Sequence, residues 1–185
     1  MPVSLASTSA SSMHGALVPI AYATFSGSTQ SATFTNIPQN YQDLMVVQYG
    51  RDSRSVVVDD LLFQVNSDGS SIYSYTYLLG NGSSASSTRG TGANFGFIFQ
   101  GMAGANATSG IFGSAEFHIL NYANTSTYKT ILGRGATDAN GSGSTTLNVN
   151  LYRSTNAVSS LLVTAYSNYS AGSTIALYGI RTVGQ

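Results

Sequence analysis

The 185-residue chain has few charged side chains. Seven Lys or Arg balance seven Asp or Glu, which together make 8% of the residues, against roughly 25% in an ordinary soluble domain. The basic residues are spread along the chain, and Arg51 and Arg54 are the only close pair. A nucleic-acid-binding protein needs clustered positive charge to displace counterions from phosphate. The charge pattern therefore speaks against a nucleic-acid partner.

Cysteine is absent and histidine occurs twice. The chain can form neither a disulfide nor a thiolate zinc site, and two histidines, one of them His14 near the start, argue against a histidine metal site. No apolar run approaches the ~18 residues of a membrane span. The first fifteen residues lack the basic and apolar regions of a secretory signal. We therefore expect no cofactor, no metal and no membrane partner.

The side-chain combinations that catalysis requires are also missing. Asp59 and Asp60 are adjacent, so in a strand they point to opposite faces, and we expect solvated turn or edge positions for them. Glu116 and His118 share a face two residues apart, which is more typical of a surface ion pair or an interface contact than of a catalytic dyad. Because no third group accompanies them, we predict that the protein is not an enzyme.

Polar, uncharged residues take the place of the missing charge. Hydrophobic residues at 42%, with 12 Tyr and 8 Phe, exclude a disordered chain. Ser, Thr, Asn and 20 Gly supply the polarity. Such a surface costs less to desolvate against a partner than one covered with ions.

Short β-rich runs alternate with turn clusters along the chain, and no window shows a helical stripe. In residues 145–152, Leu147, Val149 and Leu151 alternate with two asparagines, which predicts one buried face of aliphatic side chains and one wet face. Strands are expected at 18–25, 32–35, 43–49, 60–66, 94–100, 114–119, 128–136, 145–152, 160–166 and 173–181. Clusters such as GNGSSASSTRGTG (80–92) are expected to be turns.

About ten strands without intervening helices predict an all-β fold. Parallel pairing would need crossover connections, so we expect an antiparallel β-sandwich of jelly-roll or lectin-like type. It forms a single domain over residues 17–185. Residues 1–16 are rich in Ser, Ala and Thr and are expected to form an extended arm, either a loose terminus or a tether to a neighbouring subunit.

The last expected strand carries apolar side chains on both faces. This pattern predicts a central strand that is covered on both sides. Gly179 lies within it and has no side chain to pack, which predicts the close approach of another backbone or of a ring.

A second feature is the segment SIYSYTYLLG (71–80). In an extended conformation Tyr73, Tyr75 and Tyr77 form one stripe. Tyrosine presents a rigid, half-polar ring that can pack in a core, fill a subunit interface or stack on a sugar. A helical turn or an edge strand are further readings of the same segment. These alternatives stay open from the residues alone.

Several segments in a fixed order resemble a group of small structural proteins of tailed bacteriophages, common among viruses of marine and freshwater bacteria, including cyanophages. The shared order runs from an "IP..Y..L" strand (37–44) to a closing "LYGI" strand, and the resemblance covers roughly residues 37–180. The segments that carry it are FQVNSDGSSIYSYTYLLGNGSS (63–84), IFGSAEFHILNYANTSTYKT (111–130), LYRSTNAVSSLLVT (151–164) and AGSTIALYGIRTVGQ (171–185).

The resemblance implies a virion protein with a jelly-roll or lectin-like sandwich and no family catalytic residues. Members look like capsid decoration (cement) proteins, or like parts of tail fibres and tail tips that bind host surface glycans. The implied partners are further copies of the chain, expected as a homotrimer, and the major capsid protein or other virion proteins. A fibre shaft would show repeats or heptads. Because neither is present, we expect a location on the capsid surface, with the tail as the alternative.

Overall fold

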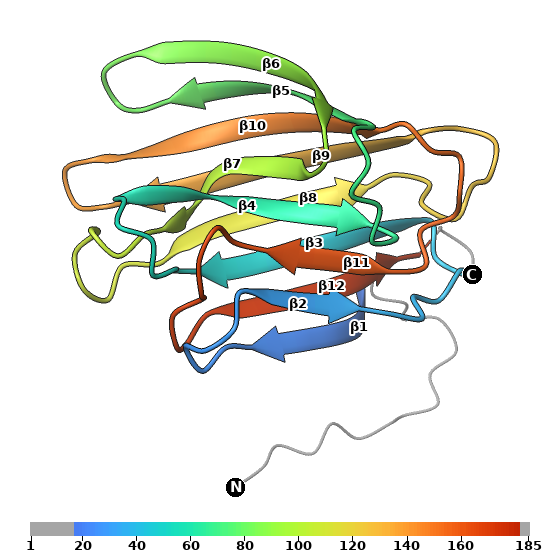
Figure 1. The fold of residues 1–185 in the computed structure, drawn as a ribbon, viewed down its shortest axis with the longest axis horizontal. Coiled ribbons are helices and arrows are strands. Elements are labelled where there is room, and N and C mark those ends of the chain that lie inside the picture. Colours follow the sequence, from blue (N-terminus) through green and yellow to red (C-terminus); the bar gives the residue numbers. More distant parts are fainter. Residues whose placement is uncertain (1–16, 182–185) are drawn as a thin grey trace, which may run out of the picture.

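The computed structural model describes residues 17–181, which form twelve strands and no helix (Figure 1). The expected arm over residues 1–16 and the residues 182–185 lie outside the described part. The strands are β1 (Leu17–Thr24), β2 (Ser31–Phe34), β3 (Asp43–Gly50), β4 (Val58–Val65), β5 (Tyr73–Gly80), β6 (Ala85–Ala93), β7 (Gly96–Ala103), β8 (Gly113–Ile119), β9 (Lys129–Asp138), β10 (Gly143–Tyr152), β11 (Leu161–Thr164) and β12 (Thr174–Ile180).

The strands form two sheets in which every strand pair is antiparallel. The large sheet has the order β1-β12-β3-β8-β9-β10-β5-β6, and the small sheet has the order β2-β11-β4-β7. Figure 1 shows β5 and β6 extending beyond the small sheet. The predicted all-β antiparallel sandwich is confirmed. The jelly-roll or lectin-like subtype stays a prediction.

The hydrophobic core fills the space between the sheets. The strand expected at residues 60–66 is confirmed as β4, and its side chains Leu61, Phe63 and Val65 are fully buried. The ring of Phe63 stacks on that of Phe117 from β8 at a centroid distance of 4.6 Å, which joins the two sheets. Burying such side chains is the main term that holds the sandwich together.

Strand β10 has the opposite orientation to the one its sequence predicts. Leu147 and Val149 are 64% and 38% exposed, while Asn148 and Asn150 are buried in the sandwich. The reason lies in β7, an edge strand of the small sheet whose outer backbone groups have no neighbouring strand. The side chain of Asn150 accepts the N–H of Phe97 at 2.9 Å and donates to its C=O at 2.8 Å. Buried backbone groups must be paired, and the asparagines supply the partners.

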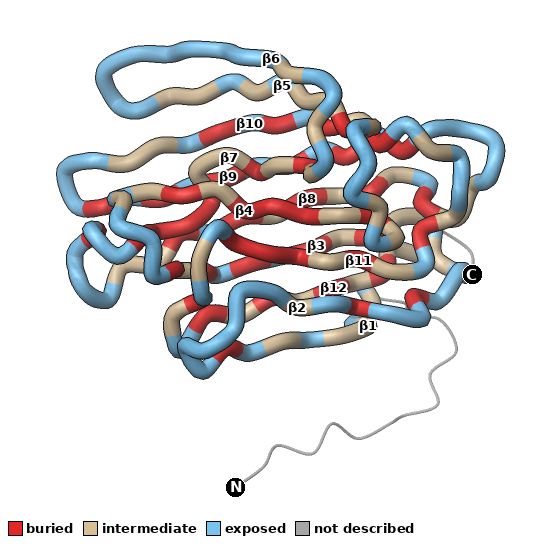
Figure 2. Tube along the Cα trace, in the orientation of Figure 1, coloured by how far each residue is buried: buried red, intermediate tan, exposed pale blue. Residues whose placement is uncertain are grey.

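Strand β6 was not predicted. It pairs only with β5, forms the edge of the large sheet and is exposed along its length (Figure 2). Its sequence ASSTRGTGA contains no large hydrophobic residue, so it carries no period-two signal. The prediction of a turn over residues 80–92 is therefore wrong for residues 85–92, which belong to the strand. The turn is confined to residues 81–84, where Asn81 accepts the backbone N–H groups of Ser83 and Ser84 at 3.0 and 2.9 Å.

The last strand lies between β1 and β3, as its apolar pattern predicts. A Cβ added to Gly179 would lie 2.3 Å from ring carbons of Tyr41, so the predicted close approach is made by a ring. The prediction that both faces are covered is wrong within the described residues. Ile175 and Leu177 point into the core, whereas Tyr178 and its neighbours on the other face are only partly buried.

Candidate functional site

The face of the large sheet that points away from the small sheet, called the outer face below, carries an unusual number of large apolar side chains. Its exposed members are Leu17, Tyr22, Val47, Tyr49, Leu78, Leu132, Leu147 and Val149. Single exposed hydrophobic residues are normal on a protein surface, but a contiguous apolar patch marks an interaction site.

The strand register places these side chains in rows across the sheet. One row runs through Val47, Glu116, Arg134, Leu147 and Leu78, each paired with the next on the neighbouring strand. Side chains alternate between the two faces of a strand, and the burial of β9 alternates strictly along its ten residues. The outer face is therefore a regular grid of side chains on a continuous sheet.

An ion pair lies near the centre of this grid. The Nε of Arg134 is 2.8 Å from a carboxylate oxygen of Glu116, and the arginine side chain is 70% exposed. Glu116 thus forms a surface ion pair, but its partner is Arg134 rather than His118, with which the sequence had suggested a pair. His118 shares the same face one row away, beside Leu132. The face contains both signs of charge side by side and has no strong field of one sign.

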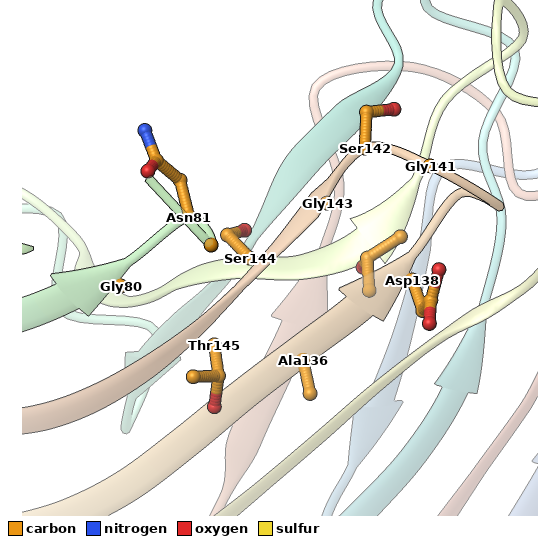
Figure 3. A pocket seen from close by; sticks show the side chains of 11 residues that line it. Gly80, Asn81, Ala136, Asp138, Gly141, Ser142, Gly143, Ser144 and Thr145 are labelled. Atoms are coloured by element: carbon orange, nitrogen blue, oxygen red, sulfur yellow. The ribbon is translucent and has the colours of Figure 1, made fainter. Parts of the chain in front are cut away.

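The hollows on the outer face are shallow. One of about 490 Å³ lies at the end of the sheet, where Gly80, Ala136 and Thr145 meet the turn residues Asn81 and Ser142. Figure 3 shows that the side chains around it are small and mostly polar. Asp138 is the acidic residue among its lining residues. A hollow of this kind can receive a protruding side chain from a partner, but it brings no set of acid and base groups together.

The stripe of three tyrosines lies on one face of β5 but divides into two environments. Tyr73 is fully buried, and its hydroxyl accepts the backbone N–H of Val65 at 2.8 Å. Burial raises the pKa of the Tyr73 hydroxyl above its ordinary value. Tyr75 and Tyr77 are partly exposed, which leaves these two as the members of the stripe that a ligand or a partner could reach.

The partly exposed tyrosines belong to an aromatic cluster at the border between the sheets. The ring of Tyr77 lies 4.0 Å from that of Phe99, and the ring of Tyr75 lies 5.4 Å from that of Phe97. The two phenylalanines stack at 5.2 Å. Because β5 extends past the small sheet, these rings close the open side of the core while keeping part of their surface exposed.

A buried pair of carboxyl groups lies at one end of the small sheet. The prediction of a solvated position for Asp59 is wrong, because both Asp52 and Asp59 are buried. One oxygen of Asp59 accepts the Arg54 guanidinium at 2.8 Å, and one oxygen of Asp52 accepts the Arg54 backbone N–H at 3.3 Å. The second oxygen of each acid is buried without a partner. Burial first, and then the neighbouring carboxylate of Asp59, raise the pKa of Asp52 to about 7.

The neighbour of this pair, Asp60, has a different role. Its carboxylate accepts the backbone N–H of Gln100 at 2.8 Å, which ties β4 to β7 next to a register shift. Burial raises the pKa of Asp60 as well. Sequence reasoning missed the buried acids because Asp52 and Asp59 are seven residues apart and meet only through the chain path around Arg54.

Residues 17–181 contain no group of three or more His, Cys, Asp or Glu side chains that could hold a metal ion. The same residues include no helix with the length and apolar character needed to cross a membrane.

Comparisons with known proteins do not assign the chain to a family. No protein-family model matches it, and a search of curated proteins finds no match. Among solved structures, it is similar to a chain in the structure of infectious bursal disease virus Gx strain, with 14% sequence identity and a TM-score of 0.09. The alignment covers 89% of this chain and 38% of that one, so this chain spans well under half of the viral protein. A TM-score this low carries no argument.

Proposed function

We propose that the protein is a non-enzymatic structural protein of a tailed-bacteriophage virion, and that it acts as a capsid decoration (cement) protein. The resemblance over residues 37–180 supplies the virion setting. The observation that carries the structural role is the outer face, a broad sheet surface with eight exposed large hydrophobic side chains and one central ion pair. Such a surface is built for contact with protein.

The charge and the apolar area of the surface are suited to a protein that binds other copies and capsid subunits. The chain has no net charge at neutral pH, so copies do not repel one another when they are packed densely on a shell. Apolar surface contributes about 25 cal/mol for each Å² removed from water, and a face of this kind forms contacts of moderate strength. Many moderate contacts, repeated over a symmetric shell, stabilise the particle through multivalency.

The copy number of the protein in purified virions tests this role. A decoration protein is present in numbers comparable to the major capsid protein, and quantitative mass spectrometry of whole particles measures that ratio. Cryo-electron microscopy of the same particles should place its density on the capsid surface. Density confined to the tail, or a handful of copies per particle, would contradict the proposal.

The aromatic cluster favours a second candidate function, a host-binding module at the tail that recognises surface glycans. Tyr75 and Tyr77 are partly exposed beside Phe97 and Phe99, and aromatic rings of this kind stack on sugars. A glycan array probed with the purified protein tests it. Binding that is lost in Tyr77→Ala and kept in Tyr128→Ala, an exposed tyrosine outside the cluster, would support this function; absence of binding by the wild-type protein would exclude it.

A further inference from the structure

The outer face has the size of a complete protein–protein interface. Eight strands spaced about 4.8 Å apart span about 34 Å, and strands of this length extend for about 25 Å, which gives a face of about 800 Å². A standard stable interface buries about 800 Å² on each partner. Twisted sheets pack face to face at an angle of about −30°, so a second sheet of the same twist fits this surface.

The charges on the face are complementary to those of a copy of the same face. Glu116 and Arg134 occupy paired positions on the neighbouring strands β8 and β9, with Val47 and Leu147 on the strands outside them. A two-fold axis that runs along the strands between β8 and β9 exchanges these strands. It places Glu116 over Arg134 of the partner subunit. An axis across the strands would instead place Glu116 over its own copy, which like-charge repulsion disfavours.

The same axis matches the apolar residues. It exchanges β10 with β3 and β5 with β12, so Leu147 lies over Val47 of the partner subunit, and Leu78 lies over Ala176 of the partner subunit. In the next row, Leu132 lies over His118 of the partner subunit. The central row then has an ion-pair quartet flanked on both sides by aliphatic contacts, the arrangement of a polar element within an apolar interface.

We propose that the outer face binds a second copy of this chain, in a two-fold dimer whose axis runs along the strands between β8 and β9. The proposal deepens the proposed function by naming the partner of its surface, and it rests on that function for its biological setting. It differs from the homotrimer expected from the family resemblance. An isologous contact closes on itself and yields a dimer, because each face is used once.

The oligomeric state of the full chain in solution tests the proposal. Analytical ultracentrifugation over a wide range of protein concentration should show a monomer–dimer equilibrium. Leu147→Lys should weaken the dimer roughly 100-fold, because an unpaired ammonium would be buried against apolar side chains. Val57→Lys is the matched control, since Val57 is an exposed hydrophobic residue that precedes β4 in the small sheet, and it should leave the dimer unchanged.

Charge exchange tests the position of the axis. Glu116→Arg and Arg134→Glu should each dissociate the dimer, because each places like charges opposite one another. Mixing the two variants should restore a heterodimer, and the double variant should restore the homodimer. Circular dichroism and thermal unfolding of each variant verify that the fold is retained, which is expected because these side chains lie on the surface.

A wild-type monomer or trimer would overturn the proposal, as would a dimer that survives Leu147→Lys or Glu116→Arg. Failure of the heterodimer to form on mixing would rule out the axis between β8 and β9. These results are independent of where the protein is located in the virion. The dimer proposal can therefore be refuted while the capsid proposal stands, and the capsid proposal can be refuted while the dimer proposal stands.

Discussion

Replacing Asp52 by Asn tests the interpretation of the buried acidic pair. The carboxyl group of Asp59 contributes to the raised pKa of Asp52, and each of the two acids has one buried oxygen without a partner. We infer that one proton on Asp52, donated to Asp59, satisfies both oxygens at once. In Asp52→Asn the amide N–H takes the place of that proton and cannot dissociate. The variant thus keeps the contact and removes its titration.

The size of the expected change in the free energy of unfolding follows from the pKa of Asp52. This pKa rises from an ordinary value of 3.8 to about 7, first through burial and then through the charge of Asp59. Each pKa unit corresponds to about 1.4 kcal/mol, so three units give an upper value of about 4 kcal/mol. The half-exposed guanidinium of Arg54 beside the pair moderates the repulsion once both acids are ionised. We therefore expect an effect of about 2 to 4 kcal/mol.

Whether the free energy of unfolding rises or falls with pH follows from the number of protons that the folded and the unfolded protein bind. Below pH 3.8 Asp52 is protonated in both states, so its full contribution to the free energy of unfolding is present and does not change with pH. Between pH 3.8 and about 7 the folded protein keeps a proton that the unfolded chain has released. The free energy of unfolding therefore falls as the pH rises through this window, and it levels off above it.

Urea denaturation of the wild type and of Asp52→Asn, measured from pH 4 to pH 8.5 at fixed protein concentration, checks this prediction. The difference between the two curves isolates Asp52 from Asp60, whose pKa is also raised by burial. The variant should gain about 2 to 4 kcal/mol relative to the wild type between the two ends of the range. Asp138→Asn, at an exposed aspartate, is the matched control and should follow the wild type. Parallel curves for the wild type and Asp52→Asn would refute the shared proton.

Three further substitutions test individual contacts by the same denaturation assay. Gly179→Ala should cost about 1 to 3 kcal/mol, because the new methyl group overlaps the ring of Tyr41, and a smaller residue at position 41 should recover part of that loss. Asn150→Ala should cost about 2 kcal/mol or more by leaving a backbone N–H and C=O of β7 buried without partners. Tyr73→Phe should cost about 1 to 2 kcal/mol, because it removes the hydroxyl that accepts a buried N–H of β4, whereas Tyr77→Phe should leave the stability close to that of the wild type.

Local sequence patterns predicted most strands because a half-buried strand alternates apolar and polar residues whatever its neighbours are. The alternation predicted the wrong buried face where a neighbouring strand required hydrogen-bond partners. In β10 the asparagines face inward because the edge of β7 requires hydrogen-bond partners, and the leucine and valine side chains are left outside. Strand β6 gave no signal because an edge strand with few core contacts needs no hydrophobic side chain.

The candidate site depended even more on tertiary structure. The sequence left open whether the three tyrosines lie on one face of a strand or on a helical turn. Only the extent of the small sheet decides that Tyr73 is in the core while Tyr75 and Tyr77 stay partly exposed. The outer face could not be assembled from the sequence, because its rows join residues from strands that are far apart in the chain. Asp52 and Asp59 could not be recognised as a buried pair from the sequence, because they meet only in the folded structure.

The amino-acid sequence by itself determined the secondary structure class, most of the strand positions, part of the turns and the absence of net charge, since these depend on neighbouring residues and on composition. The tertiary structure decided which face of each strand is inside, which polar groups are buried and which apolar residues form the outer face. The physical reason is that burial and hydrogen-bond satisfaction depend on the whole set of neighbours in space, and a strand with two different faces does not specify which one the second sheet will cover.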